Sequence, residues 1–175
     1  MSHNTNLPVK MGLVYGVILG AVVISIGIIR YRTGMILRGD QTLSFVYWEI
    51  FAMSIFYAVF RFKKLEPLLF SFNRTITIGL LAGLLSGAMY TFYIVILNNY
   101  IDTELSSKII VLNKEFVRSN PELPDKEVFD SLKFARMSSA VRGLIYTLVC
   151  ITFGIAYSLI STVVAKKIDN FNMAD

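Results

Sequence analysis

The sequence is poor in the residues on which most enzyme active sites depend. It has one cysteine, Cys150, and one histidine, His3, among 175 residues. A single cysteine cannot form a disulfide within the chain, and one histidine in a polar tail supports neither a metal site nor a Ser-His-Asp triad. Phosphate-binding and dinucleotide-binding glycine motifs are also absent. We therefore expect no enzymatic activity, no metal and no cofactor, and we interpret Cys150 as a small apolar packing residue.

Charged residues are scarce as well, at 17% of the chain, whereas globular domains contain about 25%. The apolar share is 55% and the mean hydropathy is +0.61. The net charge is +5, but the basic residues lie at the ends of long apolar blocks and form no basic face along a helix. This distribution excludes a nucleic-acid partner and is typical of membrane anchors.

Four apolar blocks are each long enough to cross the hydrocarbon core, which takes about 20 helical residues. They cover approximately residues 11–29, 42–60, 75–97 and 143–165. A helix satisfies its backbone groups in lipid, and the strict two-residue alternation of a membrane barrel is absent. The first block is longer than the roughly 7–15 apolar residues of a signal peptide, and no small-residue cleavage site follows it, so we expect it to be retained. The sequence predicts an all-α four-transmembrane-helix bundle that forms one membrane domain over residues 1–175.

The positions of lysines and arginines favour an N-terminus and a C-terminus that are both cytoplasmic. In this orientation the inner side carries Lys10, the basic loop after the second block and the lysines that follow the fourth block. Three arginines of the first outer loop, Arg30, Arg32 and Arg38, run against the rule. The predicted location is a bacterial cytoplasmic (inner) membrane.

A polar segment of about residues 101–142 separates the third and fourth blocks. Its first part carries apolar residues at helical spacing, namely Ile101, Leu105, Ile109, Leu112 and Phe116. Pro121 and Pro124 interrupt the pattern, and a second amphipathic stretch follows. We predict an extramembrane amphipathic helical hairpin between the third and fourth spans. Three alternatives are open for its apolar faces: they pack on each other, they lie on the lipid headgroups, or they form a docking surface for a periplasmic or membrane partner or ligand.

Glycines recur at every fourth position in two of the blocks. The first block has Gly12, Gly16 and Gly20, and the third has Gly79, Gly83 and Gly87. Such ladders let two helix backbones approach closely, which matters in lipid because helices there lack a hydrophobic drive to associate. The partner helix lies either in the same chain or in a homo-oligomer. The similarity of GLVYGVILGA and GLLAGLLSGA leaves open a duplication of a two-helix unit, with chance similarity as the alternative.

Glu49 is the one acid inside a predicted span. A carboxylate in the membrane is costly, and it indicates a function by default. It is either an intramembrane protonatable group or an interfacial residue that is hydrated or paired with an arginine of the first outer loop. Tyr47 and Trp48 beside it are typical of the interface. Four further span tyrosines are expected to bond to nearby backbone or serine: Tyr90, Tyr93, Tyr146 and Tyr157.

Nearly the whole chain resembles the bacterial four-helix membrane family catalogued as domain of unknown function 4199. The resemblance rests on FRFKK at the end of the second span, on LEPLLFSFNRTITIGLLAGLLSGAMYTFYIVILNNYID and on KEFVRSNPELP. Relatives usually carry Ile-Asp-Pro where this chain has Thr103 after Asp102, so the local turn is expected to differ. An acid near the start of the second span also recurs in the family, which favours an interfacial Glu49. The resemblance implies a fold and a location, and no mechanism.

The predicted function is therefore a non-enzymatic integral membrane protein with a packing, assembly or partner-docking role. The alternative is a subunit of a small transporter or channel that uses Glu49.

Overall fold

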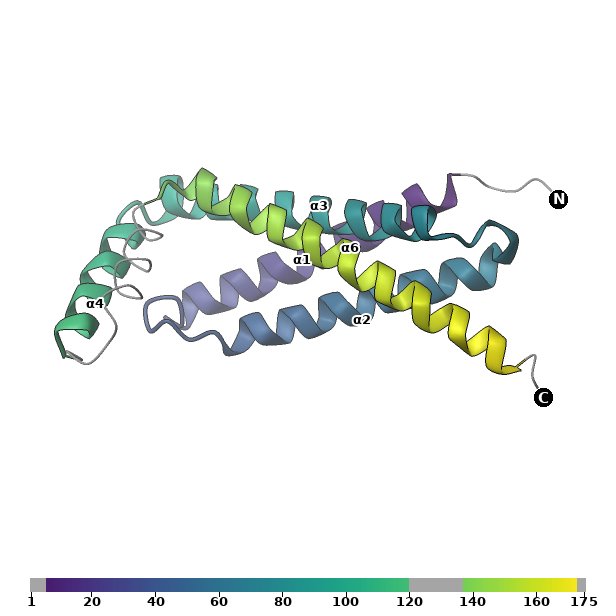
Figure 1. The fold of residues 1–175 in the computed structure, drawn as a ribbon. Coiled ribbons are helices and arrows are strands. Elements are labelled where there is room, and N and C mark those ends of the chain that lie inside the picture. The colour runs from purple at the N-terminus through teal and green to yellow at the C-terminus, as the bar shows by residue number, and fades with distance from the viewer. Residues whose placement is uncertain (1–5, 120–136, 173–175) are drawn as a thin grey trace.

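The computed structural model describes residues 6–119 and 137–172. Within these ranges, four long helices run along one another in a bundle (Figure 1): α1 (Leu7–Arg32), α2 (Thr42–Leu65), α3 (Phe72–Ile96) and α6 (Ser139–Asn172). All four are long and apolar enough to cross a membrane. The predicted all-α class with four candidate membrane-spanning helices is confirmed.

The connections divide the bundle into two distinct ends (Figure 1). Helix α1 begins, and helix α6 finishes, at the end where the 3₁₀ turn Pro67–Leu69 joins α2 to α3. The opposite end holds the α1–α2 turn and α4 (Leu105–Ser119), and we call it the α4 end. Gly34 and Gly39 allow the α1–α2 turn, because their positive φ angles of 71° and 67° are unfavourable for residues with a Cβ.

The first glycine ladder lies against α3. A Cβ added at Gly12 would meet the Cβ of Leu81 at 2.8 Å, and one added at Gly16 would meet the Cβ of Leu85 at the same distance. Gly20 faces the Met89 side chain. The absence of side chains on this face of α1 therefore lets the larger residues of α3 fill the space.

The second ladder faces the opposite partner, α6, and there the approach is backbone to backbone. A Cβ at Gly79 would lie 2.6 Å from the carbonyl carbon of Gly154, and one at Gly83 would lie 2.8 Å from that of Cys150. The two ladders therefore contact different helices of the same chain, and α3 packs between α1 and α6.

A buried hydroxyl pair also joins α3 and α6. Thr162 Oγ1 lies 2.7 Å from Thr75 Oγ1, and both side chains are fully buried. In lipid such a pair is favourable because neither hydroxyl can find water.

Helix α3 ends in a π-helical turn, Leu97–Ile101, before the chain turns into α4. The backbone N–H of Asp102 closes the turn on the carbonyl of Leu97 at 2.8 Å. The four-residue spacing of Ile101 and Leu105 predicted that they share a helix face, and this prediction is wrong. The helix is interrupted between them, and Ile101 is 60% exposed in the π-helical turn. The rest of the predicted hairpin after Ser119, with Pro121 and Pro124, lies largely outside the described residues.

Candidate functional site

A cavity of about 130 Å³ lies at the α4 end, between residues of α1, α2, α3, α4 and α6. Its polar lining consists of two arginines, four tyrosines, a serine and an asparagine: Arg30, Arg142, Tyr47, Tyr90, Tyr93, Tyr146, Ser44 and Asn98. Apolar side chains such as Val23, Ile26 and Leu105 complete the wall. This is an unusual concentration of cations and hydroxyls for the interior of a membrane bundle.

Arg142 lies in the first turn of α6 and is only 9% exposed. Its Nη2 donates to Ser106 Oγ at 2.8 Å and to Asn98 Oδ1 at 3.4 Å. Ser106 also donates to Asn98 Oδ1 at 2.9 Å, so the asparagine links α4 to α6. The π-helical turn carries Asn98 to this position, which agrees with the frequent occurrence of such turns at functional sites. The Nε of Arg142 is buried and has no partner among the described residues.

Arg30 lies in the last turn of α1 and holds the beginning of α2. Its Nη1 donates to Ser44 Oγ, and its Nη2 donates to the Asp40 carbonyl, both at 2.9 Å. As in Arg142, the Nε is buried without a partner in the described chain. All of these acceptors are neutral, so they fix the two guanidinium groups without compensating their charge.

Two carboxylates close to the cavity residues, those of Asp102 and Asp40, accept hydrogen bonds from groups other than the two arginines. Asp102 accepts from Lys108 Nζ at 3.2 Å and from the Tyr31 hydroxyl at 3.3 Å. The bond to Asp102 raises the pKa of Lys108. Asp40 accepts the backbone N–H of Thr42, which lowers its pKa, and the charges of Arg38 and Arg30 lower it further. Among the described residues, neither Arg30 nor Arg142 forms an ion pair with a carboxylate.

Aromatic rings form the wall of the cavity that faces the bundle core. Tyr90 and Tyr146 lie 4.3 Å apart between ring centroids, and Trp48 lies 6.0 Å from Tyr146. The hydroxyls of Tyr47 and Tyr93 are buried without a hydrogen-bond partner in the described part of the chain. The sequence predicted a backbone or serine partner for Tyr93, and this prediction is wrong because its ring packs on Gly27 of α1. The hydroxyl of Tyr93 is thus available to a bound molecule.

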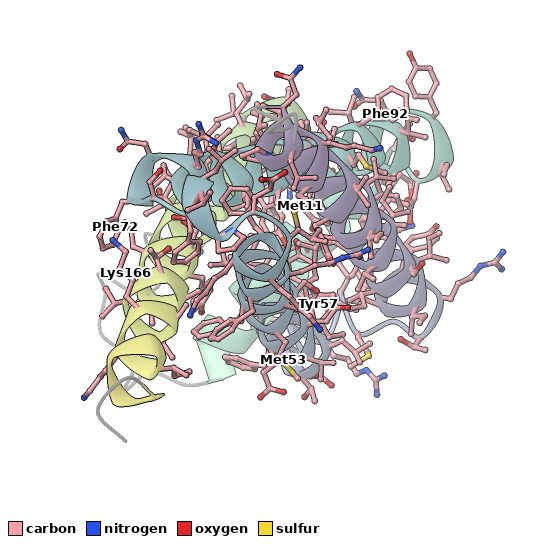
Figure 2. All side chains as sticks on the ribbon, turned by 90° about the vertical axis from the view of Figure 1, so that its right-hand side faces the viewer. Met11, Met53, Tyr57, Phe72, Phe92 and Lys166 are labelled. Atoms are coloured by element: carbon pink, nitrogen blue, oxygen red, sulfur yellow. The ribbon has the colours of Figure 1, made fainter. Side chains whose placement is uncertain are left out.

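Glu49 lies elsewhere, on the outward face of α2. It is exposed, it does not line the cavity, and the described residues offer it no ion pair with an arginine of the α1–α2 turn. Its neighbours one helical turn away, Phe45 and Met53, are 69% and 73% exposed. Figure 2 shows Met53 at the outer edge of α2, pointing away from the other helices. The acid that the sequence selected and the polar cavity are therefore separate features.

Sequence reasoning missed Arg30, Asn98 and Arg142 as parts of one site. It treated the arginines as anchors at the ends of the spans, because basic residues usually have this role there. One signal was available: Arg142 and Tyr146 are four residues apart, so both lie on one face of a helix. No pattern along the chain indicated that Arg30 faces the same space.

A comparison with protein families identifies the family of the chain. The family model described as "Protein of unknown function (DUF4199)" matches residues 14–167. The chain belongs to this family. The DUF4199 match includes both cavity arginines and the glycine ladder of α3, and it confirms the resemblance noted in the sequence. No curated protein and no solved structure matches the chain. The DUF4199 assignment and the four apolar helices together describe a multi-pass membrane protein.

Proposed function

We propose that this DUF4199 protein is a non-enzymatic membrane protein that works as an assembly, and that two copies pair through the outward face of α2. The observation that carries the proposal is the exposed position of Glu49 on that face. Its location in a bacterial inner membrane, with the α4 end outside, is part of the proposal and follows from the distribution of lysines and arginines.

Helix α2 has two contrasting faces. One face carries fully buried residues such as Phe51, Ile55 and Val59. The other carries Phe45, Glu49, Met53 and Tyr57, spaced four residues apart, and we call these four residues the α2 stripe. The three apolar members of the stripe are between 61% and 73% exposed. In a single chain, the α2 stripe therefore faces lipid.

Glu49 is too deep in α2 to reach water easily. It lies four to five residues from the middle of Thr42–Leu65, which is roughly 7 Å at 1.5 Å per residue. Half of the hydrocarbon core is about 15 Å thick, so the backbone of Glu49 lies about 8 Å below the surface of the core when the middle of α2 is placed at the centre of the bilayer. Acids inside a membrane nearly always face protein or a water-filled cavity, because a charge near the centre costs about 2.5–3.5 kcal/mol or more. A second helix over the α2 stripe would remove Glu49 from lipid.

A second copy of the chain fits this requirement. A two-fold axis along the membrane normal keeps both copies in the same orientation and brings the two α2 stripes together in parallel. The two Glu49 side chains then lie opposite each other, where they can hydrogen-bond across the interface. Phe45, Met53 and Tyr57 extend the contact on both sides.

The alternative role in transport has weaker support. An intramembrane carrier group needs a polar route through the protein, whereas Glu49 faces away from the cavity and from the bundle interior. The proposal contains no catalytic step, in line with the scarcity of catalytic residue types in the sequence.

Cysteine cross-linking in native membranes tests the pairing. Cys150 is buried and is replaced by alanine, and then Met53→Cys and Phe92→Cys are made separately. Phe92 is a matched control because it is 68% exposed and lies on a different side of the bundle from Met53 in Figure 2. Disulfides form when the two Cα atoms come within about 7 Å. We expect an oxidised dimer for Met53→Cys and none for Phe92→Cys.

Two further variants connect the dimer to Glu49. Glu49→Gln keeps a hydrogen-bonding pair and should preserve the cross-link, whereas Glu49→Ala should reduce its yield several-fold. Equal yields at positions 53 and 92 would indicate random collision and overturn the pairing. A cross-link from position 53 to a band of another mass would replace the second copy by a different membrane chain.

A further inference from the structure

The cavity at the α4 end has features that self-association does not explain. We propose that it is a binding site for a phosphate-type oxyanion, held between Arg30 and Arg142. The proposal does not depend on the pairing of α2.

The first argument is charge. A guanidinium group stays protonated at every physiological pH, so the cavity wall carries two positive charges. Neither arginine forms an ion pair with a carboxylate in the described chain, and Asp102 is occupied by Lys108 and Tyr31. Arg142 is 9% exposed, and Arg30 is half-buried and interacts with the charge of Asp40 without forming an ion pair. A buried charge without an ion-pair partner is unfavourable, and a second positive charge on the same small space adds to this cost. A bound anion would compensate both.

The second argument is the pattern of free donors. Each arginine is fixed through its Nη atoms by neutral acceptors, while its Nε remains buried and unused. The unused N–H groups are the type of donor that binds oxyanions. The hydroxyl of Tyr93 is another buried donor without a partner. These three unused donors, the two Nε–H groups and the Tyr93 hydroxyl, indicate a ligand that supplies several acceptor oxygens.

The third argument is size and depth. The cavity volume of about 130 Å³ is well below the roughly 300–1,000 Å³ of pockets for drug-sized ligands, so it suits a small oxyanion group. Arg30 lies two residues before the end of α1, and Arg142 lies three residues after the start of α6. The two arginines are thus within about one turn of the helix ends, which is the level of lipid headgroups in a bilayer, and the rest of the cavity extends deeper into the bundle. Both a free phosphate and the phosphate of a phospholipid can reach this level.

Two experiments on the full-length protein separate these sources. In the first, detergent-purified protein is titrated with inorganic phosphate, with chloride at equal ionic strength as the reference, and binding is followed by calorimetry. In the second, native mass spectrometry measures the phospholipids that remain bound after transfer from vesicles of phosphatidylglycerol or of phosphatidylcholine. Saturable phosphate binding identifies a free anion, and retention of phospholipid without phosphate binding identifies a headgroup.

The variants are chosen so that folding and binding can be told apart. Arg142→Gln and Arg30→Gln should each weaken binding roughly 10- to 100-fold, which is the usual effect of losing a charged hydrogen bond. Arg32→Gln is the matched control, because Arg32 is exposed at the same helix end and does not line the cavity. Tyr93→Phe removes a hydroxyl without a partner, so it should leave thermal stability intact and weaken binding several-fold.

The proposal is overturned if neither arm detects binding. It also fails if Arg32→Gln weakens binding as much as Arg142→Gln does, since that result would mean general attraction to a basic surface. A normally folded Tyr93→Phe variant with unchanged affinity would remove the tyrosine from the site and contradict the donor pattern described above.

Discussion

Replacing Gly79 by alanine is expected to destabilise the bundle, whereas the same replacement at Gly20 is not. Both glycines belong to ladders in membrane-spanning helices, but they face different atoms. An alanine Cβ at position 79 would lie 2.6 Å from the carbonyl carbon of Gly154 and 2.9 Å from the Cβ of Ser158. At position 20 the nearest atoms are the sulfur and the methyl group of Met89. A backbone cannot rotate away from a new methyl group, but a methionine side chain can.

The size of the effect follows from these distances. Ordinary carbon–carbon contacts begin near 3.5 Å, so α3 and α6 must separate by about 1 Å to accept Gly79→Ala. A gap of 0.5–1 Å costs the affected contacts about a quarter to a half of their dispersion energy, and overpacking typically costs about 1–3 kcal/mol. Alanine also favours a helix over glycine by up to about 1 kcal/mol, but this gain is common to both variants. Gly79→Ala should therefore be about 1–3 kcal/mol less stable than Gly20→Ala.

The assay is reversible unfolding in mixed micelles as the SDS fraction rises. Fluorescence of Trp48, the single tryptophan, and circular dichroism report the transition. Wild type, Gly20→Ala and Gly79→Ala are compared under identical conditions. Equal midpoints for the two variants, or a lower midpoint for Gly20→Ala, would refute the close backbone contact between α3 and α6.

Two other results are expected from the α3–α6 contact. A double-mutant cycle with Thr75→Val and Thr162→Val should give a coupling energy of about 0.5–1.5 kcal/mol, because the two hydroxyls lie 2.7 Å apart and are fully buried; additive effects in SDS titrations would contradict the pair. Cys150 has no exposed surface, so its thiol should react with a maleimide only after SDS unfolding; rapid labelling of the folded protein would contradict this burial.

The local features of the sequence were sufficient to predict the all-α class of the fold. The length and hydropathy of four blocks predict membrane-spanning helices, because each helix satisfies its own backbone in lipid regardless of its neighbours. The four-residue spacing of Gly79, Gly83 and Gly87 likewise defines a face from the sequence alone. The resemblance to a known family was also recognisable along most of the chain, as the match over residues 14–167 confirms.

The partners of these faces were decided only by the tertiary structure. The sequence shows two similar glycine ladders, but it does not show that one packs on α3 and the other on α6. The sequence shows Glu49 as a single acid in an apolar block. The outward direction of its side chain depends on how α2 is rotated in the bundle, which the sequence does not show.

The cavity is the clearest case of this difference. Arg30 and Arg142 are far apart in the sequence, and each resembles an ordinary anchor at the end of a span. They line one space because α1 and α6 both pack on α3 and because a π-helical turn brings Asn98 between α4 and α6. Helix formation depends on neighbours along the chain, so sequence determined it; the meeting of two charges depends on the rotation and packing of whole helices, which only the folded bundle fixes.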